Sequence, residues 1–309
     1  MIVFGRLLSF LLLVVAMQSL AQETTENQAT AQQMSDEERH QIWALEMWQS
    51  MSPQTGEILL AGDVATLNVP DSFYYLNKDD SRKVLEEVWG NPPGAADALL
   101  GMLFPAGMTP FESQTWGVTI EYEQDGYVSD VDAGDIDYAE LLEQMQADTQ
   151  LASAERVEQG YDAIVLIGWA EPPYYEAQTN KLYWAKEIKF GSAEHNTLNY
   201  NIRVLGRKGV LVLNFIAGIS QLTEISRSKD TVLAMADFNQ GSRYADFDPD
   251  LDDVAAYGIG ALVAGKVIAK TGLIAAGIIF LKKFGLIALI AAAAFIRKFF
   301  KRSKKNTVD

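Results

Sequence analysis

Residues 197–217, which read TLNYNIRVLGRKGVLVLNFIA, decide the fold of this chain. Two runs rich in strand-forming residues, 197–205 and 210–217, flank the short polar segment Gly206-Arg207-Lys208-Gly209. Strand-forming runs separated by a short turn that contains glycine are typical of a β-hairpin. Since a hairpin joins antiparallel neighbours, this stretch predicts an antiparallel sheet.

The regions before the hairpin carry further strand signals. Residues 163–169 form a continuous apolar run, which is typical of a buried strand. Residues 116–122 alternate between apolar and polar side chains, which indicates a half-buried strand. Two more strand regions are expected at 182–190 and at 57–69, the latter broken by Gly62-Asp63.

Helix signals surround these strands. Ser35-Asp36-Glu37-Glu38 is a capping box, so a helix is expected to begin there. Three more helices are expected at about 80–89, at about 137–157 with Asp137 as its cap, and at about 221–236. This order of elements predicts one α+β domain over residues 35–254, with a mainly antiparallel sheet and flanking helices.

Charge divides the chain into two parts. Residues 22–254 hold 14 Lys and Arg against 40 Asp and Glu, a balance of −26, whereas residues 255–309 hold 10 against 1, a balance of +9. An acidic domain repels phosphate backbones, so no nucleic acid partner is predicted. The chain has no cysteine, which excludes disulfides, thiolate metal sites and cysteine nucleophiles.

The N-terminus has the features of a secretory signal. Arg6 precedes an apolar run at 7–16, and Ser19-Leu20-Ala21 places small residues at the positions needed for cleavage. We therefore predict a signal peptide over residues 1–21 and a flexible leader over residues 22–34. The alternative is an uncleaved membrane helix, but the apolar run is shorter than the roughly 20 residues that a span needs.

A hydrophobic segment follows the acidic domain. Residues 255–296 are mostly Gly, Ala and large aliphatic residues, and they predict a transmembrane anchor in contact with lipid. Either 257–281 or 273–296 could cross the bilayer, and each window contains two lysines, so hydropathy does not choose between them. The basic residues at 297–309 predict a cytoplasmic tail and favour one crossing over two. The main domain is then periplasmic, and the anchor lies in a bacterial inner membrane.

Several unusual blocks occur in order along the chain. They are Val88-Trp89-Gly90-Asn91-Pro92-Pro93-Gly94, Gly126-Tyr127-Val128 with Asp132-Ala133, Gly168-Trp169-Ala170 leading to Pro173-Tyr174, Leu182-Tyr183-Trp184-Ala185-Lys186-Glu187, and Leu198-Asn199-Tyr200 with Arg203-Val204-Leu205-Gly206-Arg207. In these blocks the chain resembles a family of uncharacterised bacterial membrane-anchored proteins, domain of unknown function 2167. The resemblance covers the chain from about residue 56 onward. Some members carry a label that predicts a role in regulating amylopullulanase, a starch-degrading enzyme. The resemblance does not identify any residue of this chain as catalytic.

No set of catalytic or metal-binding residues stands out in the sequence. The acidic stretches that begin at Asp130 and Asp246 lack both the glycine at the sixth position and the closing glutamate of a calcium loop. There is no G-x-S-x-G motif, and the two histidines, His40 and His195, fall on the polar side of a predicted helix and in a predicted loop. We therefore predict no catalytic residue, no metal and no cofactor, and favour a protein that is not an enzyme.

Two segments rich in aromatic residues and proline offer a candidate binding surface. Residues 89–93 and 168–175 are expected to form rigid turns, because proline fixes the backbone and so holds neighbouring aromatic side chains at low entropic cost. The candidate residues are Trp89, Asn91, Pro92, Pro93, Trp169, Pro172, Pro173, Tyr174 and Tyr175. The alternative is that these aromatic residues seal the core beneath the turns.

Together these features predict a membrane-anchored extracytoplasmic protein that binds or regulates another envelope protein or a glycan. The alternative is an envelope glycan hydrolase that uses a pair of carboxylates, because acidic residues are abundant in the domain.

Overall fold

The computed structural model describes residues 35–265, which fall into two bodies divided after Ser52. The first contains helix α2 (Asp36–Gln49). Its predicted capping box is confirmed, because Glu38 N donates to Ser35 Oγ at 3.2 Å and Ser35 N donates to Glu38 Oε2 at 2.8 Å. The predicted signal peptide at 1–21 and leader at 22–34 lie outside the described residues.

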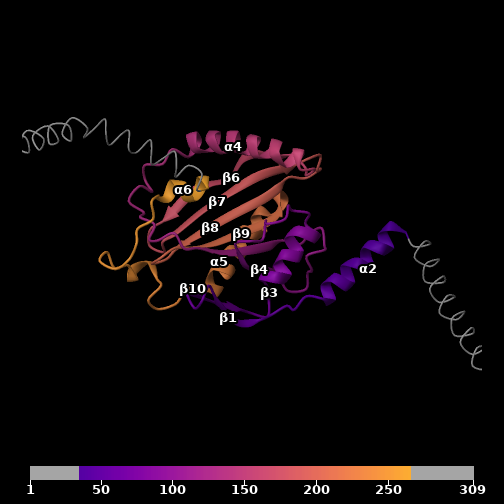
Figure 1. Ribbon diagram of the computed structural model, residues 1–309, viewed down its shortest axis with the longest axis horizontal. Helices are drawn as coiled ribbons and strands as arrows, with labels where there is room; N and C mark the ends of the chain where they lie inside the picture. Colours follow the sequence, from indigo (N-terminus) through magenta and orange to yellow (C-terminus); the bar gives the residue numbers. More distant parts are fainter. Residues whose placement is uncertain (1–34, 266–309) are drawn as a thin grey trace, which may run out of the picture. The chain divides into compact units, whose positions relative to one another are not determined.

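The second body is built on a seven-stranded antiparallel sheet with the order β3-β4-β5-β9-β8-β7-β6 (Figure 1). The predicted hairpin is confirmed near its middle, where Thr197 pairs with Gly218 and Leu205 pairs with Val210. The strands are β3 (Phe73–Asn77), β4 (Leu99–Pro105), β5 (Gly117–Glu123), β6 (Ile164–Glu176), β7 (Lys181–Phe190), β8 (Thr197–Leu205) and β9 (Val210–Gly218).

The two faces of this sheet are covered by different elements. One face packs against α5 (Leu222–Met235) and a small antiparallel sheet made of β1 (Gly56–Leu60), β2 (Ala65–Val69) and β10 (Ala236–Phe238). The other face packs against α4 (Tyr138–Glu158) and α6 (Ile259–Ala264). The domain is therefore α+β, with antiparallel sheets and flanking helices, as predicted.

The helix expected at 80–89 is divided into two kinds of helix. It begins as α3 (Lys78–Arg82) and continues as the π-helix η1 (Lys83–Val88). At its end Trp89 N donates to Val84 O at 2.8 Å, which is the wider i→i−5 bond of a π-helix. Strands β3, β4 and β10 were not predicted.

Strand β6 differs from its prediction in two ways. It lies at the edge of the sheet, and Val165 and Ile167 are 52% and 45% exposed, so the prediction of a buried strand is wrong. The strand also continues through Pro172 and Pro173, where a turn was predicted. An edge strand tolerates proline because its outward N–H groups have no partner strand. Shifts in the pairing with β7, between Trp169 and Tyr174, accommodate the interruption.

The first residues of the predicted anchor at 255–296 pack onto the domain. Ala255 N donates to Tyr127 O at 2.8 Å, and Ile259, Leu262 and Val263 of α6 are buried in the core beside α4. No helix within residues 35–265 is long and apolar enough to cross a membrane. The rest of the predicted anchor, 266–296, and the basic tail, 297–309, lie outside the described residues.

Candidate functional site

The two segments that were predicted to form one binding surface lie in different parts of the sheet. Trp89 packs against Phe104 in β4, with ring centroids 6.0 Å apart, whereas Trp169 and Tyr174 belong to β6. Strands β5, β9, β8 and β7 separate β4 from β6. The structure therefore does not bring the two segments together.

The first segment is held by bonds to its own surroundings. Trp89 Nε1 donates to Pro110 O at 3.1 Å, and the side-chain and backbone nitrogens of Asn91 donate to Leu85 O at 3.0 and 2.9 Å. Pro92 is half-buried and Pro93 is exposed. These contacts fix the segment that follows η1. They agree with the alternative, in which Trp89 covers the core.

The second segment sends its aromatic side chains to both faces of the sheet. On the α4 side, Trp169 Nε1 donates to Tyr138 O at 3.2 Å and Tyr175 OH donates to Asp130 Oδ2 at 2.8 Å. On the α5 side, Tyr174 stacks on Tyr183 with ring centroids 4.8 Å apart. Pro172 is exposed and Pro173 is buried.

Lys229 of α5 completes a tyrosine cluster on the α5 side. Its Nζ donates to the hydroxyls of Tyr174 and Tyr200 at 3.1 and 3.0 Å, and Tyr200 OH donates to Glu171 Oε1 at 3.1 Å. Burial raises the pKa of Tyr200 far above its ordinary value, so the hydroxyl stays protonated. The polar groups of this cluster bond to one another, and they tie α5 to the edge strand.

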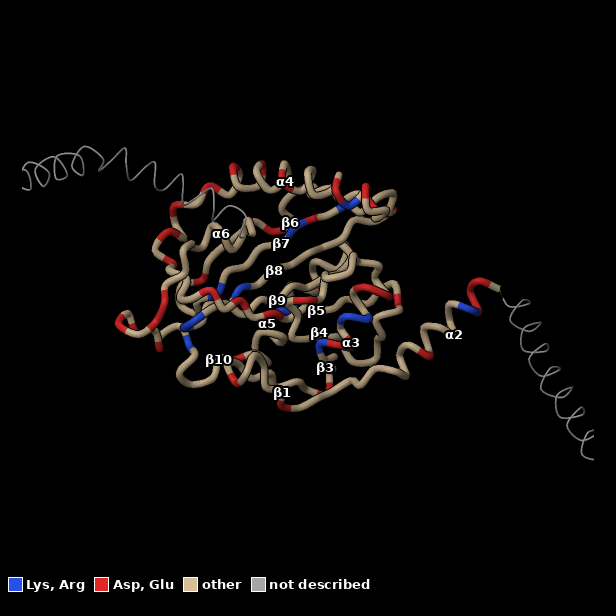
Figure 2. The backbone as a smooth tube through the Cα atoms, viewed as in Figure 1, with Lys and Arg blue, Asp and Glu red and all other residues tan. Residues whose placement is uncertain are grey.

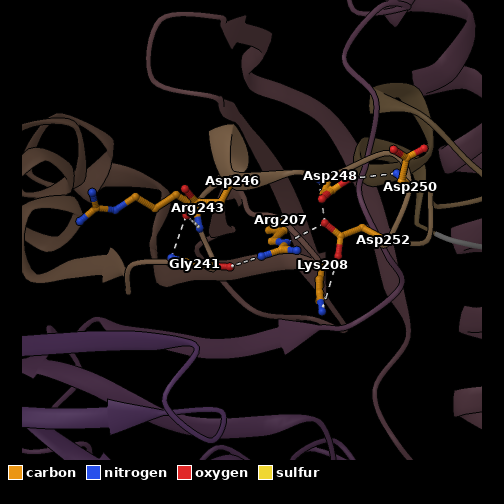
Figure 3. Close-up of polar contacts among 8 residues, drawn as sticks. All are labelled: Arg207, Lys208, Gly241, Arg243, Asp246, Asp248, Asp250 and Asp252. Atoms are coloured by element: carbon orange, nitrogen blue, oxygen red, sulfur yellow. Dashed lines mark hydrogen bonds and ion pairs between the residues drawn. The ribbon is translucent and has the colours of Figure 1, made fainter.

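The acidic loop at 246–253 is folded around its own carboxylates and two basic residues (Figure 3). Asp252 Oδ2 accepts from Arg207 Nε at 2.6 Å and from Asp248 N at 2.9 Å, and Lys208 Nζ lies 3.5 Å from Asp252 Oδ1. Asp246 Oδ2 accepts from the backbone nitrogens of Gly241 and Arg243. Within residues 35–265 no group of three or more acidic or histidine side chains is placed to hold a metal ion. The carboxylates of Asp246 and Asp252 therefore hold this loop in its conformation.

The Arg207–Asp252 pair gives an expected pH dependence. The hydrogen bond from Arg207 lowers the pKa of Asp252 from 3.8 to about 2. Because the folded pKa lies below the unfolded one, the pair stabilises the fold above about pH 4, and this contribution is lost as the pH falls towards 2. Asp252→Asn should lower the thermal unfolding midpoint at pH 7 and weaken its decline below pH 4, as measured by circular dichroism. Asp250→Asn, in the same loop but exposed, should change neither; equal behaviour of the two variants would contradict this role.

A polar strip crosses the α4 side of the large sheet. Alternate residues of a strand share a face, and β8 directs Leu198, Tyr200 and Ile202 into the α5 core. Its other residues, Asn199, Asn201 and Arg203, therefore face the opposite side. In the sheet register, Asn199 pairs with Lys186 of β7, and Asn201 pairs with Trp184 of β7 and with Asn214 of β9. We call Trp184, Lys186, Asn199, Asn201, Arg203 and Asn214 the polar face.

Direct contacts fix the arrangement of this polar face. The guanidinium carbon of Arg203 lies 4.8 Å from the centroid of the Trp184 ring. Arg203 Nη1 donates to Asn214 Oδ1 at 2.9 Å and to Ile202 O at 3.2 Å. Asn201 Nδ2 donates to Asn199 Oδ1 at 3.0 Å. The cation of Arg203 is thus stacked and oriented before any ligand binds.

The charges of the polar face are only partly balanced. Burial lowers the pKa of Arg203 to about 10, although Glu123 and Glu121 of β5 oppose this effect. Burial, and then the charge of Arg203, lower the pKa of Lys186 to about 8. Lys186 is partly exposed, and among the described residues it has no ion pair or hydrogen bond. Two cations on one face of the sheet, one of them without a partner among residues 35–265, are an arrangement that suits a binding site.

This site was not predicted from the sequence, although four of its residues lie in the blocks that carry the family resemblance. Trp184 and Lys186 belong to one block, and Asn199 and Arg203 belong to another. The available signal was the spacing of Asn199, Asn201 and Arg203, which are polar residues at alternate positions of one strand. Only the register between β7 and β8 shows that these side chains lie on one face.

Comparisons with known proteins place the chain in a family but assign it no activity. No curated protein matches it. One matching solved structure is cyanobacterial PsbP (CyanoP) from Synechocystis, which is 11% identical, covers 62% of this chain and 93% of its own, and has a TM-score of 0.32. Another is the Ran-binding protein Mog1p from Saccharomyces cerevisiae, which is 11% identical, covers 61% of this chain and 96% of its own, and has a TM-score of 0.25. The family model described as "Protein of unknown function (DUF2167)" matches residues 52–293. The chain therefore belongs to the DUF2167 family.

Proposed function

We propose that this protein is an extracytoplasmic binding module held at a membrane by its C-terminal segment, and that its ligand contacts the polar face. The observation that carries this proposal is the position of Lys186, which lies partly buried opposite Asn199, on the same face of the sheet as Arg203, with no partner among residues 35–265. Unpaired charge inside a protein lowers its stability. The fold does not use the charge of Lys186, whereas a bound ligand would.

The packing of α6 supports one of the two anchor windows. A crossing at 257–281 would pull Ile259, Leu262 and Val263 out of the core, where each is buried. In lipid these three side chains would still be in an apolar medium, but their departure would expose to water the core residues that they cover, such as Leu141 and Met145 of α4. We therefore favour a crossing at 273–296, which leaves α6 in the domain. The basic residues at 297–309 then lie in the cytoplasm, and the domain lies in the periplasm of a bacterial inner membrane.

Single-cysteine labelling tests this topology, because the chain has no cysteine of its own. With the crossing at 273–296, a membrane-impermeant maleimide added to spheroplasts should label both Ala256→Cys and Ala264→Cys. It should label Ser303→Cys only after the membrane is permeabilised. A crossing at 257–281 would bury position 264 in lipid, so labelling of Ala256→Cys alone would contradict the proposal.

Site-specific photo-cross-linking tests the use of the polar face. A photoreactive residue in place of Asn199 should form an adduct in intact cells, and Lys186→Glu should abolish that adduct. The matched control replaces Leu59, which is 58% exposed on β1 in the small sheet beyond the α5 face. Equal cross-linking at both positions, or none at Asn199, would contradict a binding role for the polar face.

One observation favours the second candidate, an envelope glycan hydrolase. Glu121 and Glu123 alternate along β5 and lie on the side of the sheet that carries the polar face. Residues two apart in a strand are separated by roughly 7 Å, which falls within the range of carboxylate pairs in glycosidases. If this candidate is correct, Glu121→Gln and Glu123→Gln should each reduce the release of reducing ends from envelope glycan at least about 100-fold. Unchanged release of reducing ends by both variants would contradict the hydrolase candidate.

A further inference from the structure

We infer that the polar face is an oxyanion site, in which Lys186 and the free edge of the Arg203 guanidinium hold a phosphate or carboxylate group. This inference rests on the proposed function, because it names the chemistry of the ligand that the polar face binds.

Arg203 presents a fork of donors that lacks an acceptor. Its Nη1 donates to Asn214 Oδ1 and Ile202 O, whereas its Nε and Nη2 have no hydrogen-bond partner among residues 35–265. Stacking on Trp184 holds the guanidinium plane. The Nε–H and Nη2–H groups lie along one edge and match two oxygens of a carboxylate or phosphate. A fork that is already oriented loses little entropy when such a group binds.

The neighbouring side chains add further donors. Asn199 Oδ1 accepts from Asn201 Nδ2, so the Nδ2 of Asn199 remains as a donor beside Lys186. Donors in this number suit an oxyanion rather than a cation. A neutral sugar fits less well, because Arg203 already lies over the Trp184 ring on which a sugar would stack.

The surrounding charges place the anion over β7 and β8. Glu121 and Glu123 act on Arg203 from β5, and Tyr257 faces it from the segment before α6. In the sheet order, β9 and β8 lie between β5 and β7. Among residues 35–265, the charge that shifts the pKa of Lys186 is the positive one of Arg203, which adds to the effect of burial. The uncompensated positive charge therefore lies on the Lys186 side of the polar face.

Calorimetric titration of the full-length protein in detergent tests the inference with two probes, inorganic phosphate and galacturonate, which separate a phosphate ligand from a carboxylate one. At least one probe should bind. Lys186→Gln should weaken its binding roughly tenfold or more. Arg203→Lys keeps the charge but loses the fork, and should weaken binding similarly. Lys189→Gln, exposed on the same strand and directed to the other face, should bind as the wild type does. Equal affinity of all variants, or no binding of either probe, would overturn the inference.

Lysine NMR provides a readout that a folding defect does not imitate. In protein labelled with ¹³C-lysine, one side chain, absent from Lys186→Gln, should titrate near pH 8, and the bound probe should raise that pKa, because an anion favours the charged amine. An unchanged titration in saturating probe would count against the site. If the oxyanion results fail while Asn199 still cross-links, the ligand chemistry is wrong and the binding face survives. If a probe binds as expected while Asn199 forms no adduct in cells, the oxyanion site survives and the proposed function is rejected.

Discussion

Gly126→Ala is expected to lower the free energy of unfolding by about 3 kcal/mol, the combined effect of backbone strain and overpacking. Gly126 has a φ of +98°, which side chains rarely tolerate, and an added Cβ would lie 2.7 Å from Asp253 O. The neighbouring backbone cannot move away easily, because Tyr127 N donates to Asp253 O and Ala255 N donates to Tyr127 O. These bonds hold the segment that leads into α6.

Urea unfolding followed by tryptophan fluorescence measures this effect. The matched control is Gly134→Ala, at a position without positive φ where a Cβ meets nothing within 4 Å; it should change stability by less than about 0.5 kcal/mol. Limited proteolysis should also show faster cleavage around residues 250–260 in Gly126→Ala only. Equal stability of the two variants would mean that the segment before α6 is not held at Gly126.

Several features of the fold that depend on neighbouring residues were predicted from the sequence. The hairpin of β8 and β9 and the caps of α2 and α4 follow from short local patterns, and all three are present. The continuation of β6 through Pro172 and Pro173 could not be predicted, because proline is tolerated there only through the strand's place at the sheet edge. That place is set by pairing with a strand elsewhere in the chain.

The candidate site was harder to predict than the fold. Trp89 and Trp169 were candidate binding residues because they lie near prolines in the sequence. Their indole nitrogens instead donate to the backbone oxygens of Pro110 and Tyr138 within the domain. Lys186 and Arg203 are separated by sixteen residues of sequence, and only the strand register shows that they lie on the same face of the sheet. The acidic composition of the domain, spread over α4 and the loops in Figure 2, also concealed a small cationic site.

Removing the charge of Lys186 is expected to stabilise the protein. The pKa of Lys186 is lowered from 10.5 to about 8, so its charged form is disfavoured in the folded state. At about 1.4 kcal/mol per pKa unit, and with a reduction because the side chain is partly exposed, this corresponds to about 2 kcal/mol at pH 7. Lys186→Met keeps the side-chain length and should raise the free energy of unfolding by about that amount.

The sign of the pH dependence separates this effect from improved packing. Because the folded pKa lies below the unfolded one, wild-type stability should rise as the pH increases from about 8 towards 10, where folded Lys186 loses its proton first. Above about pH 10 the buried tyrosines, whose pKa values burial raises, oppose this trend, so the measurement is confined to pH 7–9.5. Urea unfolding should show this rise in the wild type and in Lys189→Met, and its absence in Lys186→Met. If Lys186→Met stabilises the fold while loss of the Lys186 charge weakens oxyanion binding, the role of Lys186 is in ligand binding and not in the stability of the fold. Loss of stability in Lys186→Met across this range would instead make Lys186 a structural residue.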